Sequence, residues 1–375
     1  MNKIPFNVPL VLNTEIKNLA SVISIGKFSG DGEFTKKCNV WLESNTKSKK
    51  VLLTTSCTHA LEMAATLINI KPGDEVIMPS YTFVSTANAF ILRGAKVVFV
   101  DIRPDTMNID ETKIVDAITN KTKAIIVVHY AGIACEMDSI MEIAKINKLY
   151  VIEDAAQGLM STYKGRALGS IGHLGCLSFH ETKNYQCGEA GAIIINDEEF
   201  IDRAEIIREK GTNRSLFLKG MLDKYRWVDI GSSYLPSELN AAFLYAQLKE
   251  ANKVNKKRIL LWEEYLIQLK DIVEIELPSI PGDLKHNGHM FFIKLENVKK
   301  RQEMIDFLNR NGIQSVFHYI PLHESKECGK YNEFNGEDQY TSKESQRILR
   351  LPMYYDLNIS SIQYICKTIR GFFND

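Results

Sequence analysis

Lys183 is the residue of this sequence whose type and surroundings best suit covalent chemistry. It follows a predicted strand in the segment Ser178-Phe179-His180-Glu181-Thr182-Lys183, and the glycine-containing stretch 188–191 comes soon after. A lysine at the mouth of a sheet is partly desolvated, which lowers its pKa and frees the amine to form a Schiff base with an aldehyde. Most lysines are solvated surface charges, so this hypothesis needs support from other residues.

Asp154 and Gln157 follow another predicted strand. A carboxylate at the end of a buried strand is costly unless it meets a cation or a hydrogen-bond donor. A protonated pyridine nitrogen is one such partner, and the Gln157 amide, three residues later, can reach a hydroxyl on the same ring. The alternative, which wins if the pair is considered alone, is an aspartate that caps a helix.

Ser56-Cys57-Thr58 stands where a predicted strand gives way to a helix. Free backbone N–H groups, hydroxyl donors and the helix dipole make such a place suitable for a phosphate, although a plain N-cap explains the same residues. Phe83 follows the next strand and can stack on a flat ring, or it can be a core aromatic residue. These features gain weight because all of them lie at predicted strand ends, where ligands bind in open α/β sheets.

The elements that must position these residues alternate between strands and helices from about residue 50 to 200. Several predicted strands are apolar on consecutive positions, as in a mostly parallel sheet that is covered on both faces. Predicted helices such as Ala60–Ile68 and Met137–Ile146 return the chain across the sheet. The predicted strands are Val51–Thr54, Glu75–Met78, Lys96–Val100, Ala124–His129, Tyr150–Glu153, Cys176–Phe179 and Ala192–Ile195.

Beyond residue 200 the pattern changes to longer helices and a small α+β unit. Helices are predicted at Phe200–Lys210 and Ser237–Gln268, and Leu277–Gly288, with its prolines and glycines, resembles a link. We expect a large domain over residues 1–250 and a small C-terminal domain over residues 251–375 that starts with a long connecting helix. Its other predicted elements are a strand at Met290–Leu295, a helix at Arg301–Asn309, a strand at Gln314–His318 and a helix at Ile359–Phe373.

The bulk composition limits the partners and the compartment. The 375 residues carry a formal net charge of zero, which favours neither nucleic acid nor a membrane surface as a partner. No signal peptide and no apolar run long enough to cross a bilayer are expected. The seven cysteines are scattered and include no Cys-x-x-Cys pair, so we expect no disulfide framework, no metal site and a cytoplasmic location.

Ser178-Phe179-His180-x-x-Lys183, Asp154-x-x-Gln157 and the Ser56-Cys57-Thr58 helix start resemble the sugar-nucleotide aminotransferases. These are pyridoxal-phosphate enzymes of fold type I, the aspartate-aminotransferase-like fold. The likeness runs over nearly the whole chain and is greatest to the subgroup that makes dTDP-4-amino-4,6-dideoxygalactose. Five further segments resemble that subgroup, namely Pro79–Gly94, Asp101–Glu111, His129–Gly132, Ile207–Ser215 and Tyr319–His323.

The resemblance implies a role for each of these residues. Lys183 would hold pyridoxal 5'-phosphate and move protons, Asp154 would face the pyridine nitrogen, and Gln157 would face the ring hydroxyl. Phe83 would stack on the ring, and the phosphate would be bound by Ser56, Cys57, Thr58 and Ser178.

The resemblance also implies a homodimer with shared active sites. Ser233 stands where relatives commonly supply an asparagine to the partner's phosphate, Leu235 replaces a common arginine, and Ala190 replaces a common glycine. Asn213 and Arg214 are candidates for the substrate diphosphate. Tyr319 and His323 are candidates for contact with the sugar. For each of these four residues, an ordinary exposed polar side chain without a role in binding is an equally good interpretation.

The leading functional hypothesis is amino transfer from glutamate to the C4 keto group of dTDP-4-keto-6-deoxyglucose, for bacterial surface polysaccharide. The gluco epimer or a 3-amino sugar are alternative products. A dehydratase of the same family is disfavoured, because those relatives replace the lysine with histidine. A non-catalytic regulatory protein that binds pyridoxal phosphate is the alternative from another class, although no basic domain flanks the fold.

Overall fold

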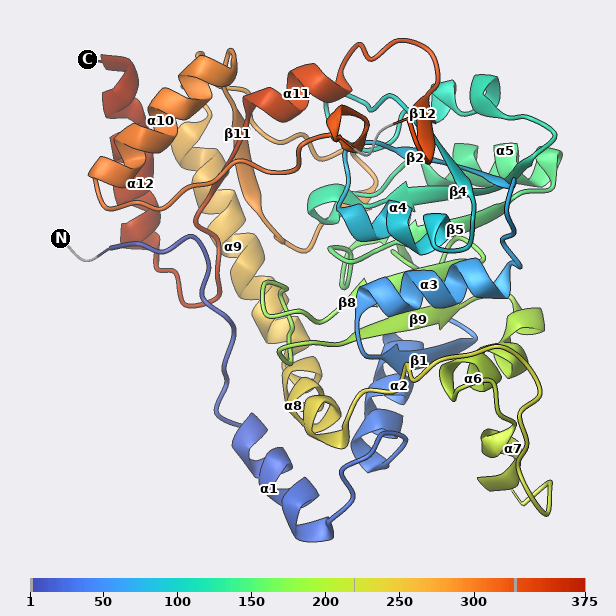
Figure 1. Cartoon of the computed structure of the whole chain (residues 1–375). Coiled ribbons are helices and arrows are strands. Elements are labelled where there is room, and N and C mark those ends of the chain that lie inside the picture. Colours follow the sequence, from blue (N-terminus) through green and yellow to red (C-terminus); the bar gives the residue numbers. More distant parts are fainter. Residues whose placement is uncertain (1–2, 219, 327–328, 375) are drawn as a thin grey trace.

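An eight-stranded sheet forms the centre of the protein in the computed structural model, which describes residues 3–218, 220–326 and 329–374 (Figure 1). Strands β9 and β1 are antiparallel neighbours, β8 pairs antiparallel with β9, and the remaining pairs are parallel. The predicted mostly parallel α/β sheet is therefore confirmed. In order across the sheet, the strands are β1 (Lys50–Thr54), β9 (Gly191–Ile195), β8 (Leu174–Ser178), β5 (Tyr150–Asp154), β4 (Thr122–Val128), β2 (Glu75–Pro79), β3 (Lys96–Val100) and β12 (Asn332–Phe334).

Both faces of this sheet are covered, as the consecutive apolar residues predict. Alternate residues of one strand enter two different cores: Val151 packs with the first and Ile152 with the second. The first core includes residues of α2 (Glu33–Thr46), α5 (Met137–Asn147) and α8 (Glu238–Lys249). The second includes residues of α3 (Cys57–Leu67), α4 (Val84–Ile91) and α6 (Ile201–Arg208). The short helices α1 (Glu15–Ile25), which packs on α8, and α7 (Arg214–Leu218) complete this part of the chain.

The C-terminal part has a core of its own around a two-stranded antiparallel sheet of β11 (Phe291–Lys294) and β13 (Ile348–Leu351). Around it lie α9 (Ala251–Leu269), α10 (Val298–Arg310) and α12 (Ile359–Asn374), with α11 (Thr341–Arg347) leading into β13 (Figure 1). However, β12 leaves this region and pairs with β3 of the large sheet. The division of the chain into domains at residue 250 remains a prediction.

Two predictions about this half of the chain are wrong, and a third is incomplete. The helix predicted at Ser237–Gln268 is two helices, because Glu250 leaves helical geometry at φ −97°, ψ 7°. The strand predicted at Gln314–His318 does not form, because Ile313 and Val316 make single bridges to different partners, Ile4 and Arg350. The predicted link also contains β10 (Leu284–Lys285), which pairs with β6 (Thr162–Tyr163) beside β7 (Arg166–Ala167).

The sheet topology brings the predicted site segments to one edge. Thr54 at the end of β1 and Ser178 at the end of β8 are both paired with Gly191, the first residue of β9. The carboxyl end of β5, with Glu153 and Asp154, lies beside β8. Segments that are more than 100 residues apart in the chain thus meet at a single edge of the sheet.

The Glu153 carboxylate fixes the loop that leads into β8. Glu153 is completely buried, and its oxygens accept hydrogen bonds from the backbone N–H groups of Gly169, Ile171 and Gly172 at 2.5 to 2.7 Å. The His129 Nε2–H donates a fourth bond at 2.8 Å, since Nδ1 of that ring accepts from the backbone N–H of Cys135. A buried acid is tolerated here because the protein itself supplies its donors.

Replacing Glu153 tests how far the fold depends on these bonds. The Glu153→Gln variant replaces one accepting oxygen with an NH₂ group that faces N–H donors, so we expect a loss of about 2–4 kcal/mol in the free energy of unfolding. Urea denaturation followed by circular dichroism measures this change. The exposed Glu296 provides the matched control, and Glu296→Gln should stay within about 0.5 kcal/mol of the unsubstituted protein. Equal free energies of unfolding for the two variants would contradict a stabilising role of the hydrogen bonds to Glu153.

Candidate active site

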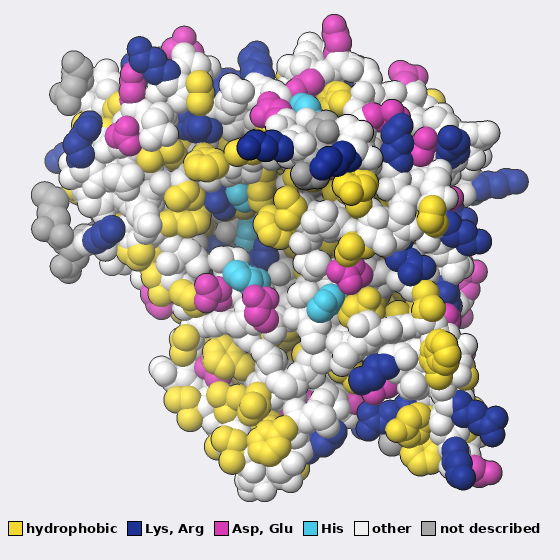
Figure 2. Space-filling view, viewed as in Figure 1, with side chains coloured by type: hydrophobic (Ala, Val, Ile, Leu, Met, Phe, Trp, Pro, Cys, Tyr) yellow, Lys and Arg dark blue, Asp and Glu magenta, His cyan; other side chains and the backbone are white. Residues whose placement is uncertain are grey.

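A cavity of about 540 Å³ opens at the carboxyl edge of the sheet, where it meets the C-terminal part. Figure 2 shows a hollow in this face of the molecule, with histidine and basic side chains inside it. Most of the residues that the sequence singles out line this one cavity, although they come from separate strands. They are Ser56, Cys57, Thr58, Phe83, Asp154, Gln157, Ser178, Lys183 and Tyr319.

Lys183 lies on the cavity wall in the turn that follows β8. Its backbone N–H donates to the His180 carbonyl at 2.9 Å, and the Glu181 N–H donates to the Gly188 carbonyl, which closes the turn. Burial lowers the pKa of the Lys183 amine, Cys57 and Asp154 act to raise it, and Arg350 lowers it further. The net direction is the one that the sequence predicts, and it favours the neutral, nucleophilic amine.

Asp154 reaches the cavity from the end of β5. One oxygen accepts a hydrogen bond from the Thr86 hydroxyl at 2.7 Å and the other from the Ala156 N–H at 3.2 Å. Burial raises the pKa of this carboxyl group, against the opposing effects of these bonds and of the Lys183 charge. No lysine or arginine of the described residues forms an ion pair with Asp154, so the carboxylate can still take a cationic N–H partner.

The start of α3 faces the same cavity. Ser56 is the N-cap, and its hydroxyl accepts a hydrogen bond from the His59 N–H at 3.1 Å. Thr58 donates its hydroxyl to Ser85 of α4 at 2.8 Å. Gly191 packs so closely beneath this turn that a Cβ atom there would lie 2.4 Å from the Cys57 nitrogen. The backbone N–H groups of this first turn are thus held in place, and the capping interpretation is correct. The binding of a phosphate by these groups stays a prediction.

Gln157, Tyr319 and Phe83 form a polar and aromatic side of the cavity. The Gln157 amide oxygen accepts from the Ala131 N–H at 2.6 Å, and its NH₂ group donates to the Tyr319 hydroxyl at 3.2 Å. The ring of Phe83 lies 6.2 Å from that of Tyr319, and 54% of Phe83 is exposed. Phe83 is therefore not a core aromatic residue, and its exposed ring is free to stack on a ligand.

Four candidate residues do not line this cavity. Ser233, Asn213 and Arg214 belong to an exposed arm, residues 209–234, which includes α7 and projects from the large sheet (Figure 1). Within the arm, Arg214 pairs with Glu209 at 2.9 Å, and Asn213 accepts from the Arg226 N–H at 2.6 Å. One copy of the chain does not bring these residues to its own Lys183.

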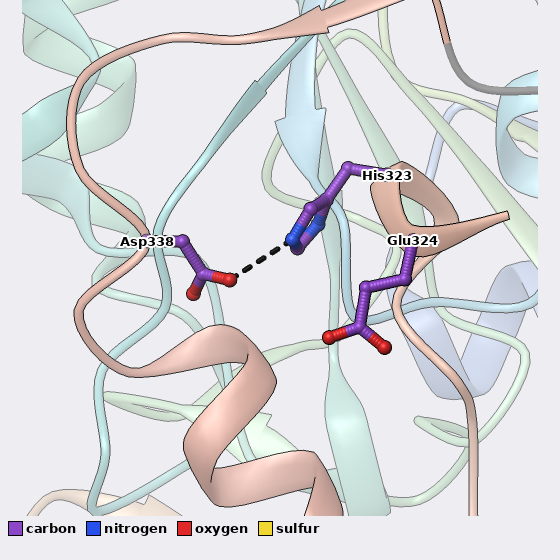
Figure 3. Close-up of side chains that lie close together, drawn as sticks. All are labelled: His323, Glu324 and Asp338. Carbon is purple, nitrogen blue, oxygen red and sulfur yellow. Dashed lines mark hydrogen bonds and ion pairs between the residues drawn. The ribbon is translucent and has the colours of Figure 1, made fainter.

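His323 lies outside the cavity, in a short turn that packs against the end of β2. Its Nδ1 and Ser80 are 2.6 Å apart, and its Nε2 donates to Asp338 at 2.9 Å (Figure 3). His323, Glu324 and Asp338 lie close enough together to hold a metal ion. They are the only such cluster of histidine and carboxylate side chains among the described residues. Both carboxylates are exposed and both ring nitrogens already have partners, so the cluster is explained as a clamp between the C-terminal part and β2.

The cavity also contains residues that the sequence analysis did not select. His289 and His318 contribute two rings whose pKa values burial lowers well below the ordinary histidine range. Arg350 comes from β13, which was not predicted, and Phe6 comes from the N-terminal segment. One feature of the sequence could have pointed to His318, namely its position directly before the candidate residue Tyr319.

No helix of the described residues is long and apolar enough to cross a membrane.

This fold and site define a class of protein, the pyridoxal-phosphate enzymes of fold type I. The structure of DesV from S. venezuelae superposes with a TM-score of 0.90 at 26% identity, covering all of both chains. The family model described as the DegT/DnrJ/EryC1/StrS aminotransferase family matches residues 10–370. The chain belongs to this family of sugar aminotransferases, and its cofactor is pyridoxal phosphate.

Two relatives match along almost their full length. The spore coat polysaccharide biosynthesis protein SpsC of Bacillus subtilis is 31% identical, over 98% of this chain and 96% of that protein. GDP-perosamine synthase of Escherichia coli O157:H7 is 28% identical over the whole of both chains.

The residues present fit this cofactor. The packed start of α3 offers N–H groups to a phosphate, Asp154 offers a carboxylate without a lysine or arginine partner among the described residues to a protonated ring nitrogen, and Lys183 offers an amine whose pKa burial lowers. All three groups face one cavity, which is what a cofactor with a phosphate, a ring nitrogen and an aldehyde requires.

The lowered pKa of Lys183 predicts how the apoprotein takes up pyridoxal phosphate. Only the neutral amine attacks the aldehyde, so the rate of covalent attachment should rise with pH and level off below the ordinary lysine pKa of 10.5. Absorbance of the yellow product follows the reaction, and borohydride reduction with peptide mapping locates the label. We expect the label on Lys183 in the protein and in the control Lys253→Arg, which changes an exposed lysine. A label spread over other lysines would refute this role.

Proposed function

We propose that this enzyme transfers the amino group of L-glutamate to the C4 keto group of dTDP-4-keto-6-deoxy-D-glucose. The product would be dTDP-4-amino-4,6-dideoxy-D-galactose for surface polysaccharide, made in the cytoplasm. The observation that carries the proposal is the partly buried Lys183 in one cavity with Asp154 and the start of α3. The six described cysteines are free thiols, as suits a reducing compartment.

Each residue has a defined task in this proposal. Bound pyridoxal phosphate supplies an aldehyde that captures nitrogen and a ring that accepts electrons. Lys183 would hold the cofactor through Nζ. Once the donor amine has displaced it, the free Nζ would move a proton from the donor α-carbon to the cofactor, and in the second half-reaction from the cofactor to the sugar carbon. Asp154 holds the ring nitrogen in its protonated form, and Ser56, Cys57, Thr58 and Ser178 bind the phosphate.

The sugar and the nucleotide are assigned from the sequence resemblance, beside two relatives whose names state what they make or serve. The name of SpsC ties that relative to polysaccharide biosynthesis, and the name GDP-perosamine synthase ties the other to a GDP-linked sugar. The choice of dTDP and of the C4 galacto product here therefore depends on the sequence resemblance. The gluco epimer or a 3-amino product requires only a different seating of the hexose beside Phe83 and Tyr319.

We also propose a homodimer in which the arm of one chain reaches the cavity of the other. The arm is isolated from its own cavity, yet it exposes Trp227 and Met221 by 79% and 68%. Ile16, Ile23 and Phe28 form further exposed apolar surface near α1. Large apolar side chains of this kind mark protein interfaces, and Ser233, Asn213 and Arg214 would then complete the partner's site.

A charge on the arm should separate the two chains. Trp227→Glu places an acidic group on the proposed interface, and we expect sedimentation velocity to show a monomer where the unsubstituted protein is a dimer. Val273→Glu is the matched control, because Val273 is 90% exposed near the end of α9, away from the arm. A dimer that survives Trp227→Glu, or a monomeric unsubstituted protein, would contradict this assembly.

The function is tested by two readouts on purified yellow protein. Addition of L-glutamate should bleach the yellow absorbance, and Lys183→Ala should reduce turnover by at least about 10³-fold, because the covalent attachment and the proton carrier are lost together. With dTDP-4-keto-6-deoxy-D-glucose and glutamate, NMR of the product reads the aminated carbon and its configuration.

Three results would overturn parts of the proposal. Protein that stays yellow with glutamate would support the alternative of a non-catalytic binder. Full activity of Lys183→Ala would refute the mechanism. An equatorial C4 amine or a 3-amino sugar would keep the enzyme class and change the product.

A further inference from the structure

Two histidine rings line the cavity in addition to Lys183, Asp154 and the start of α3. His289 comes from the segment before β11, and His318 comes directly before Tyr319. Burial lowers the pKa of both rings well below the ordinary histidine range, so each ring is neutral near pH 7. A neutral imidazole has one nitrogen that donates a hydrogen bond and one that accepts. The partner of Nδ1 therefore decides what Nε2 offers to a ligand.

The Nδ1 atom of His318 is an acceptor. Tyr81 is completely buried, and its hydroxyl has one partner among the described residues, the Tyr130 hydroxyl, to which it donates at 3.2 Å. The hydroxyl hydrogen of Tyr130 is then left for Nδ1 of His318, which lies 2.7 Å from the Tyr130 oxygen. Because Nδ1 accepts this bond, the ring hydrogen is on Nε2. His318 therefore presents an N–H donor.

The Nδ1 atom of His289 is a donor, so this ring has the opposite polarity. Its partner is the Asn184 amide oxygen at 3.0 Å. The orientation of that amide is set by its NH₂ group, which donates to the Asn287 carbonyl at 3.2 Å. An amide oxygen only accepts, so the ring hydrogen of His289 is on Nδ1 and its Nε2 has a free lone pair. His289 therefore presents an acceptor.

Both rings are held in place, and both Nε2 atoms are free. The ring of His318 stacks on that of Tyr319, with 3.6 Å between the centroids. The backbone of His289 is held by Arg258, which donates to the carbonyls of Gly288 and His289 at 3.0 and 2.7 Å. Neither Nε2 atom has a hydrogen-bond partner among the described residues, and neither is sealed from solvent. One oriented donor and one oriented acceptor thus remain available to a ligand in the cavity.

We propose that His318 and His289 select the acceptor sugar by binding the hexose hydroxyl on the carbon next to the reacting one. This inference rests on the proposed function, in which that hydroxyl is on C3, and it names the side chains that recognise the sugar. A hydroxyl group both accepts and donates, as the two Nε2 atoms require. Because both rings share the cavity with Lys183, the group that they bind must be close to the reacting carbon.

The polarity of His289 disfavours the other ligand groups that an aminotransferase cavity meets. An ionised phosphate or carboxylate has only acceptor atoms, so it has no hydrogen to give to the lone pair of His289. Its negative charge would also face that lone pair. A neutral hydroxylated ligand satisfies both rings, and the hexose is the part of the proposed substrate that provides one.

Two asparagine substitutions remove the outward groups of the rings and keep their inward bonds. The asparagine side chain has an atom at the position of Nδ1 and none at that of Nε2. His318→Asn can therefore still accept from Tyr130, and His289→Asn can still donate to Asn184. Calorimetry on the yellow holoenzyme measures the binding of dTDP-6-deoxy-D-galactose, which has no keto group to aminate, and of dTDP. We expect each variant to bind the sugar nucleotide about 3- to 10-fold more weakly, because one hydrogen bond is lost, and to change dTDP binding less than about twofold.

A ligand without the C3 hydroxyl tests the same contact from the other side. Unsubstituted protein should bind the 3-deoxy form of this sugar nucleotide about 3- to 10-fold more weakly, and the two variants should bind that form within about twofold of the unsubstituted protein. This arm carries the test if a variant does not fold. The matched control is His173→Asn, outside the cavity, which keeps the bond from the Val151 N–H to the position of Nδ1 and should leave every affinity unchanged.

The outcomes separate this inference from the proposed function. The yellow absorbance and the thermal transition report whether each variant is loaded and folded. Unchanged binding of dTDP-6-deoxy-D-galactose in both variants would overturn the inference, as would an equal loss for dTDP or for the 3-deoxy ligand. Unsubstituted protein that stays yellow with glutamate contradicts the proposed function instead, because the calorimetry involves no amino transfer.

Discussion

The site depends on how two adjacent buried carboxylates at the end of β5 are satisfied. Successive strand residues point to opposite faces, so Glu153 and Asp154 enter different surroundings. Glu153 receives three backbone N–H groups and the ring N–H of His129, all from the protein itself. From the described residues, Asp154 receives only the Thr86 hydroxyl and one backbone N–H. The first carboxylate is used to build the fold, and the second keeps hydrogen-bonding capacity toward the cavity.

The bonds to Glu153 have consequences beyond the loop they hold. That loop, residues 169–172, leads directly into β8, whose last residue, Ser178, precedes the Lys183 turn. β8 pairs with β9 so that Gly191 lies opposite both Ser178 and Thr54, and Gly191 packs under the start of α3. The lysine, the phosphate-suited turn and Asp154 are thereby placed relative to one another by sheet pairing.

The sequence predicts the elements of the large sheet well, because its strands carry apolar runs that dictate burial on both faces. Prediction fails where position depends on tertiary pairing. β12 has three residues and joins β3 from more than 200 residues away, which no local pattern reveals. The strand expected at Gln314–His318 has a suitable composition, but its one bridge, at Val316, goes to β13, and the preceding Ile313 bridges to the N-terminal segment. For the same reason Lys183 could be selected from its motif and Arg350 could not.

The electrostatics of the cavity show why a residue such as Arg350 matters for the reactive lysine. Burial and Arg350 both lower the pKa of Lys183, whereas Asp154 raises it. Because burial and the guanidinium both disfavour the charged form, the Lys183 amine is a better nucleophile toward the cofactor aldehyde than a solvated lysine.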